Sequence, residues 1–297
     1  MHIQNWSRKF GLYFAAILLS LGVLILYGIA TRHSDIPRFA GDDEMRLMQR
    51  TRVNCPVPGP DTFVLIGMGQ SNAGNWGEPV TSTSRANSDV FEFWQGNCYQ
   101  AASPMLGATG STSSLWPELG QSLVESGVAK QVVILVFSVD GAPIKRFVAR
   151  DDLWPLWRAQ LKLLLEFFPV DYYLWLQGEA DFSRRTTSED YQRLFADLYH
   201  SIKDVDRGAL VFIPIQSYCA QTERWTPKNE ISTAQAAIPV AMEGTLAGVD
   251  SDAILSEAGT RWDGCHPSAR GYAIWAKAWA SRIAKERPKS FETGLSR

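Results

Sequence analysis

A serine, an aspartate and a histidine stand where together they could cleave an ester. Ser71 follows an apolar run in "FVLIGMGQSNAGNWGE" (63–78), and Asp263 and His266 lie in "WDGCHPSARGY" (262–272). A serine hydroxyl becomes a good nucleophile when a histidine takes its proton, and a carboxylate then orients the imidazole and stabilises its charged form. Asp263 and His266 are three residues apart, so both can reach one site. We therefore predict Ser71 as nucleophile, His266 as base and Asp263 as its partner.

Each of these residues also has a structural interpretation on its own. Gly-x-Ser is common in turns, and an isolated aspartate often caps a turn. The case depends on their occurring together beyond predicted strands. The G-x-S-x-G turn of α/β-hydrolases does not fit, because Ala73 stands at the position of the second glycine.

A tetrahedral oxyanion requires hydrogen-bond donors aimed at the developing charge. We expect three donors: the backbone N–H of Ser71, the backbone N–H of Gly110 in "GATGSTSS" (107–114), and the side-chain amide of Gln177 after a predicted strand. Gly107 is an alternative to Gly110.

Apolar runs alternate with amphipathic segments along the chain. This order predicts an α/β fold with a central parallel sheet, right-handed crossovers and helices on both faces. Ligands in such folds bind beyond the carboxyl ends of the strands. The predicted strands are 62–68, 90–94, 131–139, 171–177 and 209–216, and the predicted helices are 114–127, 151–169, 188–205 and 268–286.

Residues 10–30 form an uncharged stretch of 21 residues, "FGLYFAAILLSLGVLILYGIA", preceded by Arg8 and Lys9. It is long enough to span a bilayer, and the flanking positive charges favour a cytoplasmic N-terminus. The alternative is a signal peptide cleaved after Ala30. We predict residues 1–31 as a cytoplasmic N-terminus and membrane anchor, 32–60 as a juxtamembrane linker, and 61–297 as a catalytic domain on the periplasmic or extracellular side.

Four cysteines are consistent with an exported domain. Of the three possible connectivities we expect Cys55–Cys98 and Cys219–Cys265, with free buried thiols as the alternative. The chain contains no CxxC motif, so we predict no metal site. A net charge of -2 gives no indication of nucleic-acid binding.

Three blocks in order resemble the SGNH hydrolases, and within them the sialate O-acetylesterase-like and carbohydrate esterase family 6 group. The blocks are "GQSNAGNWGE", "WLQGEAD" (175–181) and "DGCHPSARGY", with a looser match in "DGAPIKRF" (140–147). The resemblance implies a three-layer α/β/α flavodoxin-like fold and ester chemistry without a cofactor. It also implies that Gln177 replaces the asparagine of other SGNH enzymes.

Residues beside the matching blocks would position the loops around the site: Gln70, Asn72, Glu179 and Asp181. Tryptophans near the motifs could stack on sugar rings, although most tryptophans belong to cores. We expect Trp76 and Trp262 at the rim of the substrate site, ahead of Trp116, Trp154 and Trp225.

These observations predict a membrane-anchored serine esterase that removes acetyl groups from a carbohydrate. The alternative is a polysaccharide O-acetyltransferase, in which a sugar hydroxyl replaces water as acceptor. A glycan-binding module without activity is disfavoured, because the triad is complete. The expected partners are an acylated glycan, the membrane, and a membrane acyl-donor or polysaccharide export protein.

Overall fold

The strand that precedes Ser71 lies at the centre of the sheet. In the computed structural model, which describes residues 43–79, 88–219 and 224–286, strand β2 (Thr62–Gly69) is buried along its whole length. It pairs in parallel with β5 (Gln131–Ser138) on one side and β6 (Tyr172–Leu176) on the other. Burial on both faces explains why β2 is a continuous apolar run instead of an alternating one.

The sheet has the strand order β1-β4-β3-β5-β2-β6-β7-β8. The pairs that join β3, β5, β2, β6, β7 and β8 are parallel, as predicted. The remaining strands have the bounds β1 Arg52–Val53, β3 Val90–Trp94, β4 Asn97–Gln100, β7 Val211–Ile215 and β8 Thr245–Asp250.

The predicted central parallel sheet is extended at one edge by an antiparallel pair of strands, which the sequence did not indicate. Strand β4 pairs antiparallel with both β3 and β1. Gln95 and Gly96 between β3 and β4 have φ values of 49° and 76°. Two consecutive left-handed residues form the tight turn that a two-residue hairpin needs.

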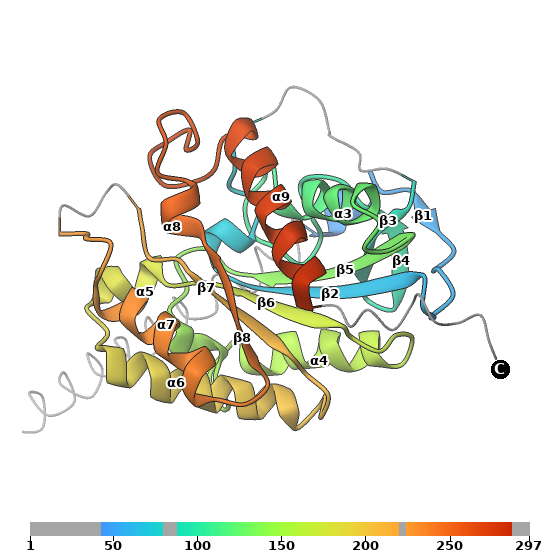
Figure 1. Ribbon diagram of the computed structural model, residues 1–297. Helices are drawn as coiled ribbons and strands as arrows, with labels where there is room; N and C mark the ends of the chain where they lie inside the picture. Colours follow the sequence, from blue (N-terminus) through green and yellow to red (C-terminus); the bar gives the residue numbers. More distant parts are fainter. Residues whose placement is uncertain (1–42, 80–87, 220–223, 287–297) are drawn as a thin grey trace, which may run out of the picture. The chain divides into compact units, whose positions relative to one another are not determined.

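Helices cover both faces of this sheet (Figure 1). Helices α3 (Leu115–Glu125) and α9 (Ala269–Glu286) lie on one face, and α4 (Trp154–Leu165), α6 (Ser188–Lys203) and α7 (Glu230–Ala241) lie on the other. The sequence did not indicate α7 or β8. Helix α7 contains Pro239 and begins at a capping box formed by Asn229 and Ser232.

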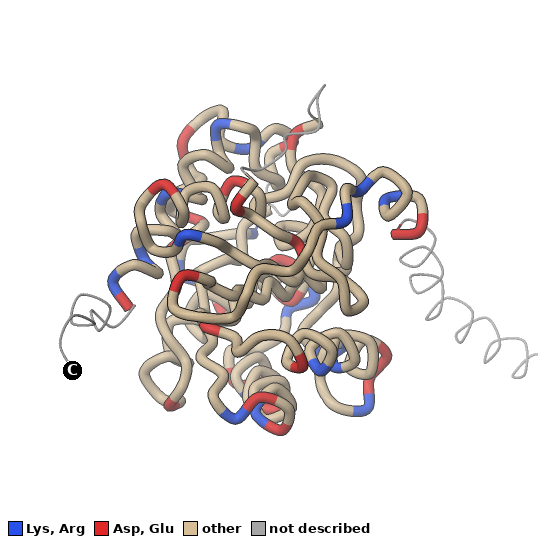
Figure 2. Tube along the Cα trace, turned by 90° about the vertical axis from the view of Figure 1, so that its right-hand side faces the viewer, with Lys and Arg blue, Asp and Glu red and all other residues tan. Residues whose placement is uncertain are grey.

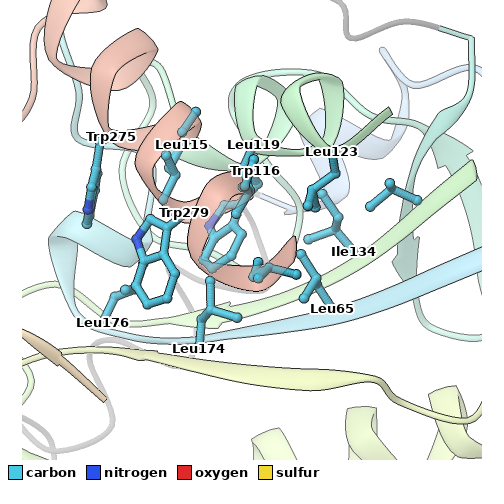
Figure 3. Packing of buried hydrophobic residues seen from close by; sticks show 14 of the residues in the cluster. Leu65, Leu115, Trp116, Leu119, Leu123, Ile134, Leu174, Leu176, Trp275 and Trp279 are labelled. Carbon is cyan, nitrogen blue, oxygen red and sulfur yellow. The ribbon is translucent and has the colours of Figure 1, made fainter. Parts of the chain in front are cut away.

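Tryptophans fill the layer between α3, α9 and the sheet. Figure 3 shows Trp116, Trp275 and Trp279 among leucines from α3 and from the strands. Trp116 is fully buried, and its indole Nε1 donates to the carbonyl of Ala73, 2.7 Å away, in the turn that carries Ser71. Trp116 is therefore a core residue that supports the nucleophile turn, and it does not contact sugar.

The predicted linker over residues 32–60 is wrong for its second half. Residues 43–60 belong to the same compact unit as the sheet, and residues 43–47 are helical. Arg46 donates to the carbonyl of Ala108 at 2.7 Å, and Arg50 forms a buried ion pair with Glu92, with Nε and Oε1 2.5 Å apart. Burial raises the pKa of Glu92 to about 7, although Arg50 opposes the shift. These arginine contacts and β1 tie the segment to the sheet.

Both predicted disulfides are present: Cys55–Cys98, which joins the segment before β2 to β4, and Cys219–Cys265.

The predicted membrane segment 10–30 lies outside the described residues. No helix within the described residues is long and apolar enough to cross a bilayer. Basic and acidic residues are interspersed over the described chain in Figure 2, which agrees with the small net charge.

Gly67 in β2 leaves the room that Trp116 occupies. A Cβ at position 67 would lie 2.1 Å from the indole ring, whereas a Cβ at Gly59 would meet nothing within 4 Å. We expect Gly67→Ala to lower the free energy of unfolding by about 1–3 kcal/mol, because a packed core cannot absorb the added methyl group. Gly59→Ala is the matched control, and urea unfolding followed by tryptophan fluorescence measures both. An equal effect of the two substitutions would contradict this packing.

Candidate active site

Backbone hydrogen bonds continue the sheet up to the residue before Ser71. Gln70 N–H donates to the carbonyl of Leu176 at 3.1 Å, and Val139 N–H donates to the carbonyl of Gly69 at 3.1 Å. The chain then enters a 3-10 turn, η1 (Ser71–Ala73). A Cβ at Gly69 would lie 2.0 Å from the Leu176 carbonyl oxygen, so this close approach requires glycine. Ser71 is thus held at the carboxyl edge of β2.

Asp263 and His266 contact each other in the loop before α9. His266 Nδ1 lies 2.7 Å from Asp263 Oδ2, and Asp263 Oδ1 accepts hydrogen bonds from the backbone N–H groups of Cys265 and His266. Desolvation alone would raise the pKa of Asp263, but these hydrogen bonds outweigh it and lower the pKa below its ordinary value. The carboxylate is therefore ionised at neutral pH and fixes the imidazole with Nε2 as the free ring nitrogen.

Ser71 and His266 line one cavity of about 310 Å³ beyond the strand ends. His266 Nε2 is buried and makes no hydrogen bond to any described residue. The Ser71 Oγ–Nε2 hydrogen bond is therefore not formed in this conformation. Catalytic hydrogen bonds are often long in a free enzyme and tighten when substrate binds. The structure thus brings the three predicted residues to one place, but the hydrogen bond between Ser71 Oγ and His266 Nε2 is not formed.

Trp76 is a wall of this cavity and packs against the histidine. Its ring is stacked on the His266 imidazole, with centroids 5.9 Å apart and an interplanar angle of 28°. Trp262 does not line the cavity; it is 45% exposed, and its Nε1 donates to the carbonyl of Trp76 at 3.1 Å. Of the two predicted rim residues, Trp76 faces the site and Trp262 supports it from behind.

The prediction that the Gln177 amide faces the cavity is wrong. Its side chain is fully buried, and its Nε2 lies 2.6 Å from Asp181 Oδ2 and 3.3 Å from both the Ala142 carbonyl and Gln70 Oε1. An amide nitrogen has two hydrogens, and these acceptors take both. Gln177 thus ties together the loops after β2, β5 and β6 instead of offering a donor to an oxyanion.

Gly110 and Gly107 also lie outside the cavity lining. Gly110 pairs with Asn75 in an isolated bridge and accepts a hydrogen bond from Arg46, and Gly107 N–H donates to the Asp43 carboxylate. Both glycines therefore shape the loop behind Trp76. The prediction of Gly110 as an oxyanion donor does not match this placement.

Gly141 is the glycine that lines the cavity beside Ser71. It follows β5 and has a φ of 60°. The sequence carried a signal for it, because "DGAPIKRF" follows the strongest apolar run. What the sequence lacked was the adjacency of β5 and β2, which sets Gly141 next to the nucleophile.

Glu179 is a buried carboxylic acid on the cavity wall, at the start of α5 (Glu179–Arg184). Its Oε1 accepts from Asn72 at 2.5 Å and from Gln216 at 3.1 Å, and its Oε2 has no hydrogen-bond partner among the described residues. Burial raises the pKa of Glu179 to about 7, since desolvation outweighs these hydrogen bonds. Asn72 and Glu179 thus link the nucleophile turn to α5.

Gln70 and Asp181 hold the surrounding loops. Gln70 Oε1 accepts from the N–H of Ala180 at 2.9 Å, and Asp181 accepts from the N–H of Ile144 at 2.8 Å and from Thr186 Oγ1 at 2.8 Å.

The Cys219–Cys265 disulfide forms another wall of the cavity, since both cysteines line it. No group of His, Cys, Asp and Glu within the described ranges is arranged to hold a metal ion.

Comparison with known proteins places this site in a family. A family model described as carbohydrate esterase, sialic acid-specific acetylesterase, matches residues 61–281, a span that includes Ser71, Asp263 and His266. The chain therefore belongs to this family of carbohydrate esterases, which confirms the resemblance read from the motifs. No curated protein sequence matches the chain.

Solved structures share the fold at low sequence identity. A protein from Arabidopsis thaliana is 14% identical with a TM-score of 0.57, covering 77% of this chain and 99% of its own. A carbohydrate esterase family 3 protein from Talaromyces cellulolyticus (10% identity, TM-score 0.49, 75% and 97% covered) and an acetyl xylan esterase from Geobacillus stearothermophilus (15%, 0.48, 76% and 96%) are more distant. Of these three structures, the Arabidopsis protein supports the mixed α/β fold with its mostly parallel sheet.

The raised pKa of Glu179 predicts a pH-dependent stability. The folded protein binds this proton more tightly than the unfolded chain, so the stabilisation is complete below the ordinary value of 4.5 and is lost as pH rises through about 7. We therefore expect the free energy of unfolding of Glu179→Gln to rise by about 3 kcal/mol relative to that of the wild type as the pH increases from about 4.5 to about 8.

Urea unfolding at a series of pH values measures this difference. Glu189→Gln, at an exposed position on α6, is the control and should not change with pH relative to the wild type. A Glu179→Gln difference that is constant over the pH range would show that Glu179 is not a buried proton-binding group.

Proposed function

We propose that this protein is a serine esterase that removes acetyl groups from a carbohydrate. The observation that carries the proposal is the Asp263–His266 contact of 2.7 Å beside a cavity that Ser71 also lines. Membership of the carbohydrate esterase family supports it. The acetyl group and the carbohydrate come from the family, while the nucleophile and base come from the geometry.

In the first half of the reaction, Ser71 Oγ bonds to the ester carbonyl carbon and its proton passes to His266 Nε2. The carbonyl oxygen becomes an oxyanion. The bond to the sugar oxygen then breaks, His266 gives its proton to that oxygen, and an acetyl-serine remains. Asp263 stays ionised throughout and stabilises the imidazolium, as its lowered pKa requires.

In the second half, water attacks the acetyl-serine while His266 takes its proton, the bond from the acyl carbon to Ser71 Oγ breaks, His266 returns the proton to that oxygen, and acetate leaves. The oxyanion of both halves would lie between the N–H groups of Ser71 and Gly141, which line the cavity together. Gly141 takes the place that the sequence analysis gave to Gly110 and Gln177. Trp76, stacked on His266, keeps the imidazole from rotating while Nε2 exchanges its proton.

We further propose that the enzyme is exported and held at the membrane by residues 10–30. Two disulfides favour an oxidising compartment, and 21 uncharged residues suffice to span a bilayer. The active site would then face the periplasmic or extracellular side and meet acetylated glycans there. A membrane acyl-donor or a polysaccharide export protein is the protein partner that such a position would favour.

Replacement of Ser71 tests the nucleophile. We expect Ser71→Ala to lower kcat for acetate release from 4-nitrophenyl acetate and from acetylated xylo-oligosaccharides by about 10³-fold or more, because no acyl-enzyme can form. Ser183→Ala, a second serine of the cavity lining, is the matched control, and its kcat should stay within about tenfold of the wild type. Equal activity of Ser71→Ala and the wild type would disprove this assignment.

The same assay distinguishes hydrolysis from transfer. With a non-acetylated oligosaccharide present as acceptor, an esterase releases acetate at the same yield per ester consumed. An O-acetyltransferase would move most of the acetyl groups to the acceptor. That result would show that a sugar hydroxyl, instead of water, attacks the acetyl-serine in the second half of the reaction.

A further inference from the structure

A second cavity lies behind the disulfide wall of the active site. It has a volume of about 370 Å³, within the range of small-molecule sites. Its lining includes Tyr218 and Gly264, the chain neighbours of Cys219 and Cys265, and those two cysteines line the catalytic cavity. The Cys219–Cys265 disulfide is therefore the partition between the two cavities. None of the catalytic residues lines the second one.

Two aromatic rings form a corner of this cavity. Tyr218 and Trp225 meet edge to face, with ring centroids 4.7 Å apart and an interplanar angle of 84°. Trp225 Nε1 donates to Ser217 Oγ at 3.0 Å, which fixes the orientation of the indole. Both residues are half-buried, so each leaves part of a ring for a ligand. An aromatic face held in this way packs well against the C–H face of a sugar ring.

A buried arginine lines the same cavity and packs on one of its aromatic rings. The Arg261 side chain is 6% exposed, and its Nε makes no hydrogen bond to any described residue. Its guanidinium lies over the Tyr218 ring, 4.9 Å from the centroid, and Nη1 donates to the carbonyl of Cys265. Arg261 therefore holds the Tyr218 ring in place at the cavity.

The charges around the cavity are balanced. Asp252 lies 3.9 Å from Arg261 and accepts hydrogen bonds from the N–H groups of Ser217 and Tyr218. Glu257, also in the lining, forms an ion pair with Arg270 at 2.6 Å. Each acidic side chain thus has a basic partner, and the cavity carries little net charge. This balance favours a neutral sugar over a sugar acid.

We propose that this second cavity binds a neutral sugar unit of the substrate glycan, adjacent to the acetylated unit that reacts at Ser71. One face of the sugar ring packs on Trp225 and Tyr218. The proposal rests on the proposed esterase function and adds to it the substrate class: an oligosaccharide or polysaccharide that crosses the Cys219–Cys265 partition, instead of a single sugar.

The test is the dependence of kcat/KM on chain length. The full chain is assayed with acetylated xylo-, manno- and gluco-oligosaccharides from monosaccharide to tetrasaccharide, and with 4-nitrophenyl acetate. We expect the longer chains to exceed the monosaccharide by about tenfold in at least one series, mainly through KM, because stacking on an aromatic pair contributes about 1 kcal/mol or more. Trp225→Ala should remove this gain, and Trp225→Phe should keep most of it.

Trp154→Ala, which removes a half-buried tryptophan of α4 outside both cavities, is the matched control and should keep the full gain. The readout is the ratio of longest chain to monosaccharide within each variant, so a change in folded fraction cancels. A wild type without chain-length gain in all three series, or a gain that survives Trp225→Ala, would overturn the second sugar site. A wild type inactive on 4-nitrophenyl acetate as well would instead overturn the esterase function.

Discussion

The parallel pairing of β2 with both of its neighbours is the constraint from which the site follows. Because β5, β2 and β6 run in the same direction, their carboxyl ends meet at one edge, where the chain turns into Gly141, Ser71 and Glu179. The hydrogen bonds of Gly69 and Gln70 carry this ladder to the residue before the nucleophile. The Asp263–His266 loop then has only to come over this edge, and the start of α9 brings it there.

Beneath this edge lies a layer of buried polar groups. Asn72, Gln177 and Gln216 hydrogen-bond with Glu179 or Asp181, and Tyr191 donates from below to Gln177 Oε1 at 2.9 Å. Such groups are costly to bury unless they are paired, and the cost is visible in the raised pKa of Glu179. What the protein gains is a rigid connection among three loops that come from different strands. The loops can then hold donors and nucleophile in a fixed relation.

The sequence predicted the parts of this account that depend on local pattern. The continuous apolar runs marked the strands that are buried on both faces, and the position of Ser71 just after one of them marked the functional edge. The three-residue spacing of Asp263 and His266 predicted their contact. Local pattern also sufficed for the helices that begin and end at clear caps or prolines.

Other features depend on contacts that no local pattern encodes. Gln177 and Gly141 follow the strands on either side of β2, but only the folded structure shows that Gly141 lines the cavity and that Gln177 hydrogen-bonds to Asp181. Residues 43–60 look like a polar linker until Arg50 is seen to meet Glu92 inside the fold. The second cavity joins Tyr218, Trp225 and Arg261 from segments whose meeting is fixed by the Cys219–Cys265 disulfide.

The central claim is that Ser71 carries the acetyl group between the two halves of the reaction. The most direct measurement is rapid acid quenching of the full chain during turnover of 4-nitrophenyl acetate, followed by peptide mass spectrometry. The account predicts an acetyl group on the peptide that contains Ser71 in the wild type, and none on that peptide in Ser71→Ala. Acetylation of a different residue during turnover, or wild-type turnover with no acetyl group on the peptide that contains Ser71, would contradict it.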